Sequence, residues 1–182
     1  MKEKATKNQS IVKVISVGNA GGNIIDYLYK KQQIKAHFIA CDTNTDDLKK
    51  RIIPDKFLLD DNDLSELFQG NEKAIILIVG LGGKASSNYA TKIAQCSENK
   101  KIPFYAIVNT PFAFEGENVY KKSQETINEL EKYTRNIFII DLEKAKQENK
   151  NLFISSFFHK ISEEFGQKIQ EFLENILPLH EN

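Results

Sequence analysis

Apolar residues along the chain gather in short runs that alternate with polar or glycine-rich turns. Continuous runs of aliphatic and β-branched residues predict buried strands at 11–17, 37–41, 74–79, 104–108 and 136–140, with a short edge strand at 56–59. Apolar residues three and four positions apart predict helices at 22–31, 87–99 and 118–134. A short helix is expected at 63–68, and a long amphipathic helix runs from Phe153 to about Ile176, before Pro178.

The alternation of strands and helices predicts an α/β fold: a three-layer, Rossmann-like parallel sheet with helices on both faces, ending in a long helix. We divide the chain into a flexible leader at 1–10, one domain at 11–177 and a tail at 178–182. Sheets of this kind bind ligands at the carboxyl ends of their strands, and the glycine-rich turns follow the predicted strands here. A ligand site is therefore expected at that edge of the sheet.

Two polar segments and a set of aromatic residues carry alternative readings. Asp42, Asp46 and Asp47 follow the second strand and could bind a cation, but a helix-capping cluster is favoured. The segment EKAKQENK at 143–150 predicts a solvated loop or a helix end. The long helix carries phenylalanines at helical spacing, which we assign mainly to the core: Phe153, Phe157, Phe158, Phe165 and Phe172.

Composition narrows the class of protein. Among 182 residues, Lys plus Arg and Asp plus Glu both total 25, so no broad basic field for nucleic acid is expected. Cys41 and Cys96 form no CxxC pair and no ligand cluster with the three histidines, which predicts reduced thiols and no metal site. No apolar stretch approaches the ~20 residues of a membrane span. We therefore expect a soluble cytoplasmic protein without membrane or nucleic-acid partners.

Two glycine-rich turns are candidate phosphate sites, because glycine lets backbone N–H groups approach an anion at a helix N-terminus. The first is GNAGGN at 18–23. A dinucleotide fingerprint GxGxxG would need glycine where Ala20 and Asn23 stand, so that motif fails. The second is GLGG at 80–83. A P-loop ending at Lys84 would need glycine at Ile78 and a hydroxyl residue at Ala85, so it fails too.

Four blocks in order resemble the nucleotide-binding half of the FtsZ/tubulin family: KVISVGNAGGNIIDYL, HFIACDTNTDDL, IILIVGLGG and AIVNTPFAFEG. The resemblance covers roughly residues 11–175. It implies the family's GTPase-domain fold, a role connected with cell division or the cytoskeleton, and binding of GTP with Mg²⁺ or of GDP, in a weak or vestigial form. Guanine nucleotide, full-length FtsZ and the chain itself are the implied partners.

The resemblance also implies which residues lie near the nucleotide: Gly18, Ala20, Gly21, Gly22 and Asn23 in the first turn, Gly82, Gly83, Lys84 and Ser86 in the second, Pro111 and Glu115 in the third, and Phe157 in the long helix. By this analogy Gly21, Gly22 and Asn23 lie by the phosphates and the base, and Gly82 and Gly83 approach the phosphates. Glu115 reaches the ribose and Phe157 stacks on guanine. The alternatives are close packing for the glycines, a solvated carboxylate for Glu115 and a core position for Phe157. Lys84 either pairs with a phosphate, fills the pocket or faces solvent.

Several positions depart from the family pattern. The signature GGGTGTG reads GGKASSN at 82–88. Val119 stands where the family usually has a nucleotide-contacting arginine. Asp141-Leu142-Glu143 stands near the usual Asn-Asp pair, and Ser162 lies about where an aspartate reads the base. These departures imply weakened recognition of guanine.

Family members continue past the long helix with an acidic loop and a second domain, whereas this sequence stops at Asn182. We therefore expect no catalytic residues and no efficient hydrolysis by the chain alone, since a positioned general base contributes roughly 10²–10⁴-fold to a rate. The sequence predicts a divergent FtsZ-like GTP/GDP-binding domain related to division or filament regulation. Alternatives are a pseudo-GTPase that caps FtsZ filaments, a GTPase completed by a partner's loop, and an unrelated doubly wound domain for another phosphorylated ligand.

Overall fold

The computed structural model describes residues 11–60 and 63–177. Its six strands form one sheet in the order β3-β2-β1-β4-β5-β6, and every neighbouring pair is parallel. The strands are β1 (Ile11–Val17), β2 (His37–Asp42), β3 (Lys56–Leu58), β4 (Glu72–Gly80), β5 (Phe104–Thr110) and β6 (Ile137–Asp141). This confirms the predicted α/β class. The predicted leader at 1–10 and tail at 178–182 lie outside the described residues.

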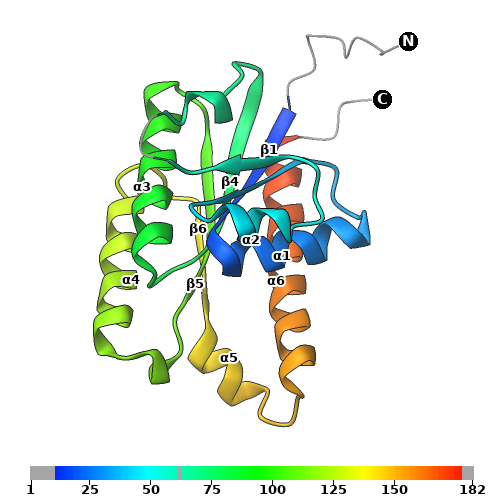
Figure 1. Cartoon of the computed structure of the whole chain (residues 1–182), viewed down its shortest axis with the longest axis vertical. Coiled ribbons are helices and arrows are strands. Elements are labelled where there is room, and N and C mark those ends of the chain that lie inside the picture. Colours follow the sequence, from blue (N-terminus) through cyan, green and yellow to red (C-terminus); the bar gives the residue numbers. More distant parts are fainter. Residues whose placement is uncertain (1–10, 61–62, 178–182) are drawn as a thin grey trace.

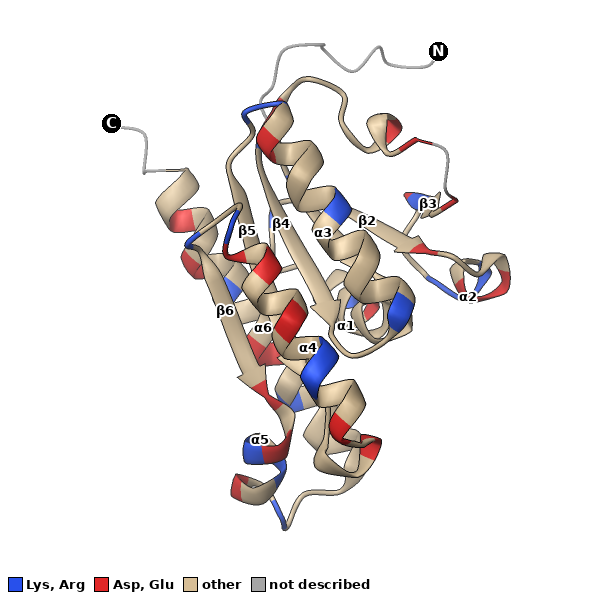
Figure 2. Cartoon of the chain, turned by 90° about the vertical axis from the view of Figure 1, so that its left-hand side faces the viewer, with Lys and Arg blue, Asp and Glu red and all other residues tan. Residues whose placement is uncertain are grey.

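Helices cover both faces of this sheet (Figure 1). The long helices are α1 (Gly18–Lys31), α3 (Lys84–Asn99), α4 (Glu117–Leu130) and α6 (Ile154–Ile176), the short ones are α2 (Thr45–Lys49) and α5 (Leu142–Glu148), and two 3₁₀ turns are η1 (Ser65–Leu67) and η2 (Ala113–Glu115). α1 and α6 pack on one face. α3 and α4 lie side by side on the other (Figure 2). None of the helices in the described parts of the chain is long and apolar enough to cross a bilayer.

β4 lies at the centre of the sheet and is buried on both faces. Ile76 and Ile78 pack under α1 and α6, whereas Ile75, Leu77 and Val79 pack under α3 and α4. All five side chains are fully enclosed, which explains why this strand reads as a continuous apolar run rather than as an alternating one.

One buried ion pair, formed by Lys13 and Glu72, lies within this apolar framework. Lys13 in β1 has no exposed surface. Its Nζ donates to the carbonyl of Leu67 at 2.7 Å and to Glu72 Oε1 at 2.6 Å. Glu72 Oε2 also accepts the amide of Gly70 at 2.9 Å. The pair thereby fastens the segment that leads into β4 to the neighbouring strand β1.

Several element boundaries differ from the sequence predictions. α1 begins at Gly18 rather than residue 22, and α3 begins at Lys84 rather than residue 87, because each glycine turn enters its helix directly. The predicted helix at 63–68 is only the 3₁₀ turn η1.

The polar segments hold the two short helices. Asn44 Oδ1 accepts the amides of Asp46 and Asp47 at the start of α2, so the capping interpretation of this segment is confirmed. Asp141 Oδ1 accepts the amide of Lys144 at the start of α5, so most of 143–150 is helix rather than loop. An Asx cap compensates for the small number of hydrogen bonds that each short helix makes.

Candidate functional site: the glycine rim

The turns at 18–23, 80–88 and 109–116, which we call the rim, meet at the carboxyl ends of β1, β4 and β5. A Cβ atom built on Gly80 would lie 2.8 Å from Ala20 Cβ, and one built on Gly82 would lie 3.6 Å from Pro111 Cβ. The amide of Leu81 donates to the carbonyl of Asn109 at 3.0 Å. The structure therefore brings together the three segments that the sequence singled out, and their glycines permit this close approach.

Two long helices begin at the rim without neutralising groups. Neither α1 nor α3 has a side-chain cap or an acidic residue in its first turn, and α3 begins with Lys84. The first four amides of a helix have no intrahelical acceptor, and the dipole places positive potential there. The short helices α2 and α5 instead carry the caps Asn44 and Asp141. The rim is thus a place where two helix N-termini favour an added anion.

Two buried hydroxyls on the strands next to the rim lack hydrogen-bond partners within the described part of the chain. They are Ser16 Oγ in β1 and Thr110 Oγ1, the last residue of β5. Thr110 is 4% exposed. A buried polar group without a partner costs about 1–3 kcal/mol, which a ligand oxygen or water at the rim would recover. Thr110 is not among the site residues predicted from the sequence, although it lies in the block NTPFAFEG.

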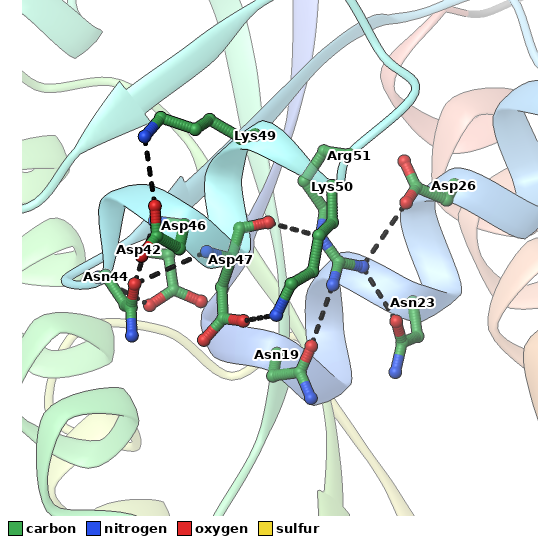
Figure 3. A network of polar contacts seen from close by, with 10 residues as sticks. All are labelled: Asn19, Asn23, Asp26, Asp42, Asn44, Asp46, Asp47, Lys49, Lys50 and Arg51. Atoms are coloured by element: carbon green, nitrogen blue, oxygen red, sulfur yellow. Dashed lines mark hydrogen bonds and ion pairs between the residues drawn. The ribbon is translucent and has the colours of Figure 1, made fainter.

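Arg51 covers the outer side of the first turn (Figure 3). Its Nη1 donates to Asn23 Oδ1 at 2.7 Å and lies 3.2 Å from Asp26 Oδ2. Its Nη2 donates to Asn19 Oδ1 at 2.7 Å. A Cβ atom on Gly22 would lie 2.9 Å from Nη1, so glycine at this position leaves room for the guanidinium. Sequence reasoning missed Arg51, because KKR after a polar helix is typical of a solvated run.

Val119 in the first turn of α4 covers the second turn. A Cβ atom on Gly82 would lie only 2.5 Å from Val119 Cγ1, and Gly82 has φ +113°, a conformation that other residues rarely adopt. Both observations require glycine here for packing and backbone geometry. Lys84 beside it is exposed, which agrees with the reading in which its side chain faces solvent.

The third turn is organised by carboxylates. Glu115 is exposed, and its Oε1 accepts the amide of Phe112 at 2.8 Å. Glu143 in α5 accepts the amide of Ala113 at 3.0 Å, and this hydrogen bond holds the pKa of Glu143 below its usual range. A ribose contact by Glu115 stays a prediction, since this side chain already closes its own turn.

Phe157, the predicted base stacker, lies in the first turn of α6 and is 6% exposed. Its ring packs 6.1 Å from Phe112 and 5.3 Å from Phe158, measured between centroids. The side chain is therefore part of the core in this conformation, and stacking on guanine stays a prediction. No cluster of three or more metal-ligating side chains occurs within residues 11–60 and 63–177.

Comparison with known proteins gives this geometry a family context. No family model matches the chain. FtsZ of Porphyromonas gingivalis is 23% identical over 177 residues, covering 84% of this chain and 39% of that protein. FtsZ of Buchnera aphidicola subsp. Baizongia pistaciae is 24% identical over 159 residues, covering 75% of this chain and 41% of that protein. The chain thus spans about two fifths of the length of these relatives.

Solved structures agree with the sequence comparison. An FtsZ of M. jannaschii superposes with a TM-score of 0.81 at 20% identity, covering 93% of this chain and 58% of that one. The fold is that of the FtsZ/tubulin GTPase domain. CetZ2 from Haloferax volcanii, solved as a GTPγS-bound protofilament, superposes with a TM-score of 0.75 at 17% identity over 93% of this chain and 60% of that one. In sequence and in fold the chain resembles FtsZ, as its four blocks predict.

Proposed function

We propose that this FtsZ-like chain binds a guanine nucleotide, GDP or GTP with Mg²⁺, at the rim, and that it acts in cell division or the cytoskeleton. The observation that carries the proposal is the convergence of two uncapped helix N-termini, those of α1 and α3, on glycine turns that lack first-turn carboxylates. The resemblance to FtsZ supplies the class of ligand. The unpartnered Thr110 hydroxyl at the end of β5 supports an oxygen-rich ligand at the same edge.

The coverage of the rim sets the strength of binding that we expect. Arg51 lies over Gly22 and Val119 lies over Gly82, so a ligand has less exposed backbone available than the glycines alone would offer. Lys84 is free to approach a phosphate as a point charge, since its side chain is exposed at the first position of α3. We therefore infer weak binding in which charge contributes more than backbone contacts.

Isothermal titration with GDP and with Mg²⁺ and GTP tests the proposal, and two variants sharpen it. Lys84→Glu should weaken binding about tenfold or more, since a charge-assisted hydrogen bond contributes about 1.5–3 kcal/mol. The same substitution should raise helix stability by about 0.3–1 kcal/mol, because it places an acid in the first turn of α3. Lys30→Glu, in the last turn of α1, is the matched control that should lower stability and leave binding unchanged.

Thr110→Val is the second variant. It keeps the side-chain shape and removes the unpartnered hydroxyl, so the ligand-free protein should gain about 1 kcal/mol of stability while nucleotide affinity falls. Opposite changes in stability and affinity separate a ligand site from a purely structural position. Absence of heat and of thermal shift at millimolar nucleotide would end the proposal.

A second candidate function is an interaction protein that has lost nucleotide binding and caps FtsZ filaments. The two side chains that cover the rim, Arg51 and Val119, favour it. Light scattering of full-length FtsZ assembly in the presence of this chain is the test. Reduced polymer at substoichiometric ratios would support capping, whereas unchanged assembly at an equimolar ratio would count against it.

A further inference from the structure

An aromatic cleft lies where α5 ends and α6 begins, at the lower end of the molecule in Figure 1. It has a volume of about 590 Å³. Its walls include Phe112 and Phe114 of the third turn, Phe153 and Phe158 of α6 and its cap, and Lys146 and Lys150. We call it the α5–α6 cleft. Its residues Phe112 and Phe114 belong to the third turn of the rim, and Phe157, the predicted base stacker, also lines it. The cleft therefore adjoins the proposed nucleotide site.

The apolar residues of this cleft are unusually exposed. Phe153 is 84% exposed, Ile154 78% and Phe114 76%. The assignment of the α6 phenylalanines mainly to the core is confirmed for Phe157, Phe165 and Phe172, but Phe153 and the 46% exposed Phe158 face outwards. Phe114 also stacks on Phe112, with centroids 5.1 Å apart and planes 12° apart, so the surface is ordered by ring packing. Adjacent exposed aromatic groups of this size mark an interaction site.

The charge at the cleft has one sign. Lys146 and Lys150 line it, and no carboxylate does. Lys146 Nζ lies 5.5 Å from the centroid of the Phe114 ring, which holds the cation at the apolar surface. Lys146 also forms an ion pair with Glu143 at 3.6 Å, but Glu143 does not line the cleft. α6 begins here without a side-chain cap or an acidic first turn, which adds to the positive potential.

We propose that the α5–α6 cleft docks an acidic, amphipathic peptide segment of a partner protein. The hollow accepts aromatic or aliphatic anchors between Phe114 and Phe153, and Lys146 and Lys150 pair with carboxylates on either side of them. Anchors in an apolar groove with complementary charges at its edge are the recognition mode of helix-in-groove complexes. A bilayer also engages exposed apolar groups, so a membrane surface is an alternative outcome of the test.

Fluorescence anisotropy with a labelled probe tests this proposal. The probe is a synthetic amphipathic peptide with Leu and Phe at positions i, i+3, i+4 and i+7 and Glu at the remaining positions. A control peptide has Lys in place of every Glu. We expect saturable binding of the Glu peptide and at least tenfold weaker binding of the Lys peptide. Lys150→Glu should reduce or invert this preference, because it reverses a lining charge.

Phe153→Ser should weaken binding of the Glu peptide at least tenfold. The variant should still fold, since the Phe153 ring is solvent-exposed. Ile139→Ser, on exposed β6, is the matched apolar control and should leave binding unchanged. Equal binding of both peptides, or binding that survives Phe153→Ser, would overturn the proposal. If the protein sediments with anionic phosphatidylserine vesicles and binds the Glu peptide only weakly, the cleft is a membrane surface instead. If the protein dimerises and Phe153→Ser abolishes the dimer, the cleft is a self-association surface. Nucleotide affinity should be unchanged in these variants. A loss of peptide binding can then be assigned to the cleft and not to the proposed nucleotide site.

Discussion

The buried Lys13–Glu72 pair makes a quantitative prediction for the stability of this fold. Lys13→Met keeps the length and apolar part of the side chain but leaves the Glu72 carboxylate, whose side chain has no exposed surface, without its cation. Removing one partner of a buried ion pair costs about 3–5 kcal/mol. A domain of this size is stable by about 5–15 kcal/mol, so one substitution should remove a large part of the total.

The pH dependence of this loss follows from the two opposing influences on Glu72. Burial by itself would raise the pKa of Glu72, but the hydrogen bond from Lys13 and the amide of Gln69 outweigh it, so the pKa is lowered. The stabilisation is therefore present above the ordinary glutamate pKa and is lost as pH falls through the lowered value. Without Lys13, burial should dominate and the pKa of Glu72 should rise. The stability gap between wild type and Lys13→Met should then narrow on acidification from about pH 7 to about pH 4.

Urea unfolding followed by far-UV circular dichroism measures these differences. Adding Glu72→Gln to Lys13→Met should recover part of the loss, because it removes the unpaired charge and keeps one oxygen to accept either the amide of Gln69 or that of Gly70. Lys30→Met, at an exposed position of α1, is the control and should change stability by less than about 0.5 kcal/mol. If the double variant is no more stable than Lys13→Met, or the gap does not narrow in acid, the charge argument is wrong.

Three further predictions concern stability and reactivity. Arg51→Ala should cost about 2–3 kcal/mol in urea unfolding, because it leaves Asp26 without its buried cation. Gly21→Ala should cost about 1–3 kcal/mol in the same assay, since its Cβ would lie 2.8 Å from the backbone oxygen of Ile78, which cannot turn away. With a thiol reagent at mildly alkaline pH, Cys96 should react before Cys41 in the native protein. Cys41 is buried, and this burial raises the pKa of its thiol far above the usual range, whereas Cys96 is partly accessible.

The central strands could be predicted from the sequence, because continuous apolar runs between turn signals are typical of strands that are covered on both faces. Ala74–Val79 was predicted as a central strand and is enclosed on both faces. The short helices were missed for a local reason: their five and seven residues carry few apolar positions, and single Asx caps start them. The predicted division between core and surface along α6 failed at Phe153 and Phe158, because helical spacing does not show where the partner elements end.

The rim was predicted in part for a similar reason. Its turns follow strands whose order in a parallel sheet brings their carboxyl ends together, so sequence alone places them near one another. Arg51 could not be predicted, since its contacts join a loop after α2 to a helix 25–32 residues earlier in the chain. Thr110 could be located but not assigned, because only coordinates show that its hydroxyl is buried without a partner.

Arg51 also couples the rim to the rest of the fold. Its guanidinium donates hydrogen bonds to Asn19, to Asn23 and, at 3.2 Å, to the carbonyl of Asp47. Arg51 therefore joins the start of α1 to α2. A ligand that draws the Asn23 oxygen away from Arg51 would break the hydrogen bond from Nη1, which would keep only its contact with Asp26, and this loss would lower the affinity for that ligand. A ligand that engages only the amides and Lys84 meets no such cost. If the rim binds a nucleotide, as we propose, this arrangement of charges favours contacts to the phosphates over contacts to the base.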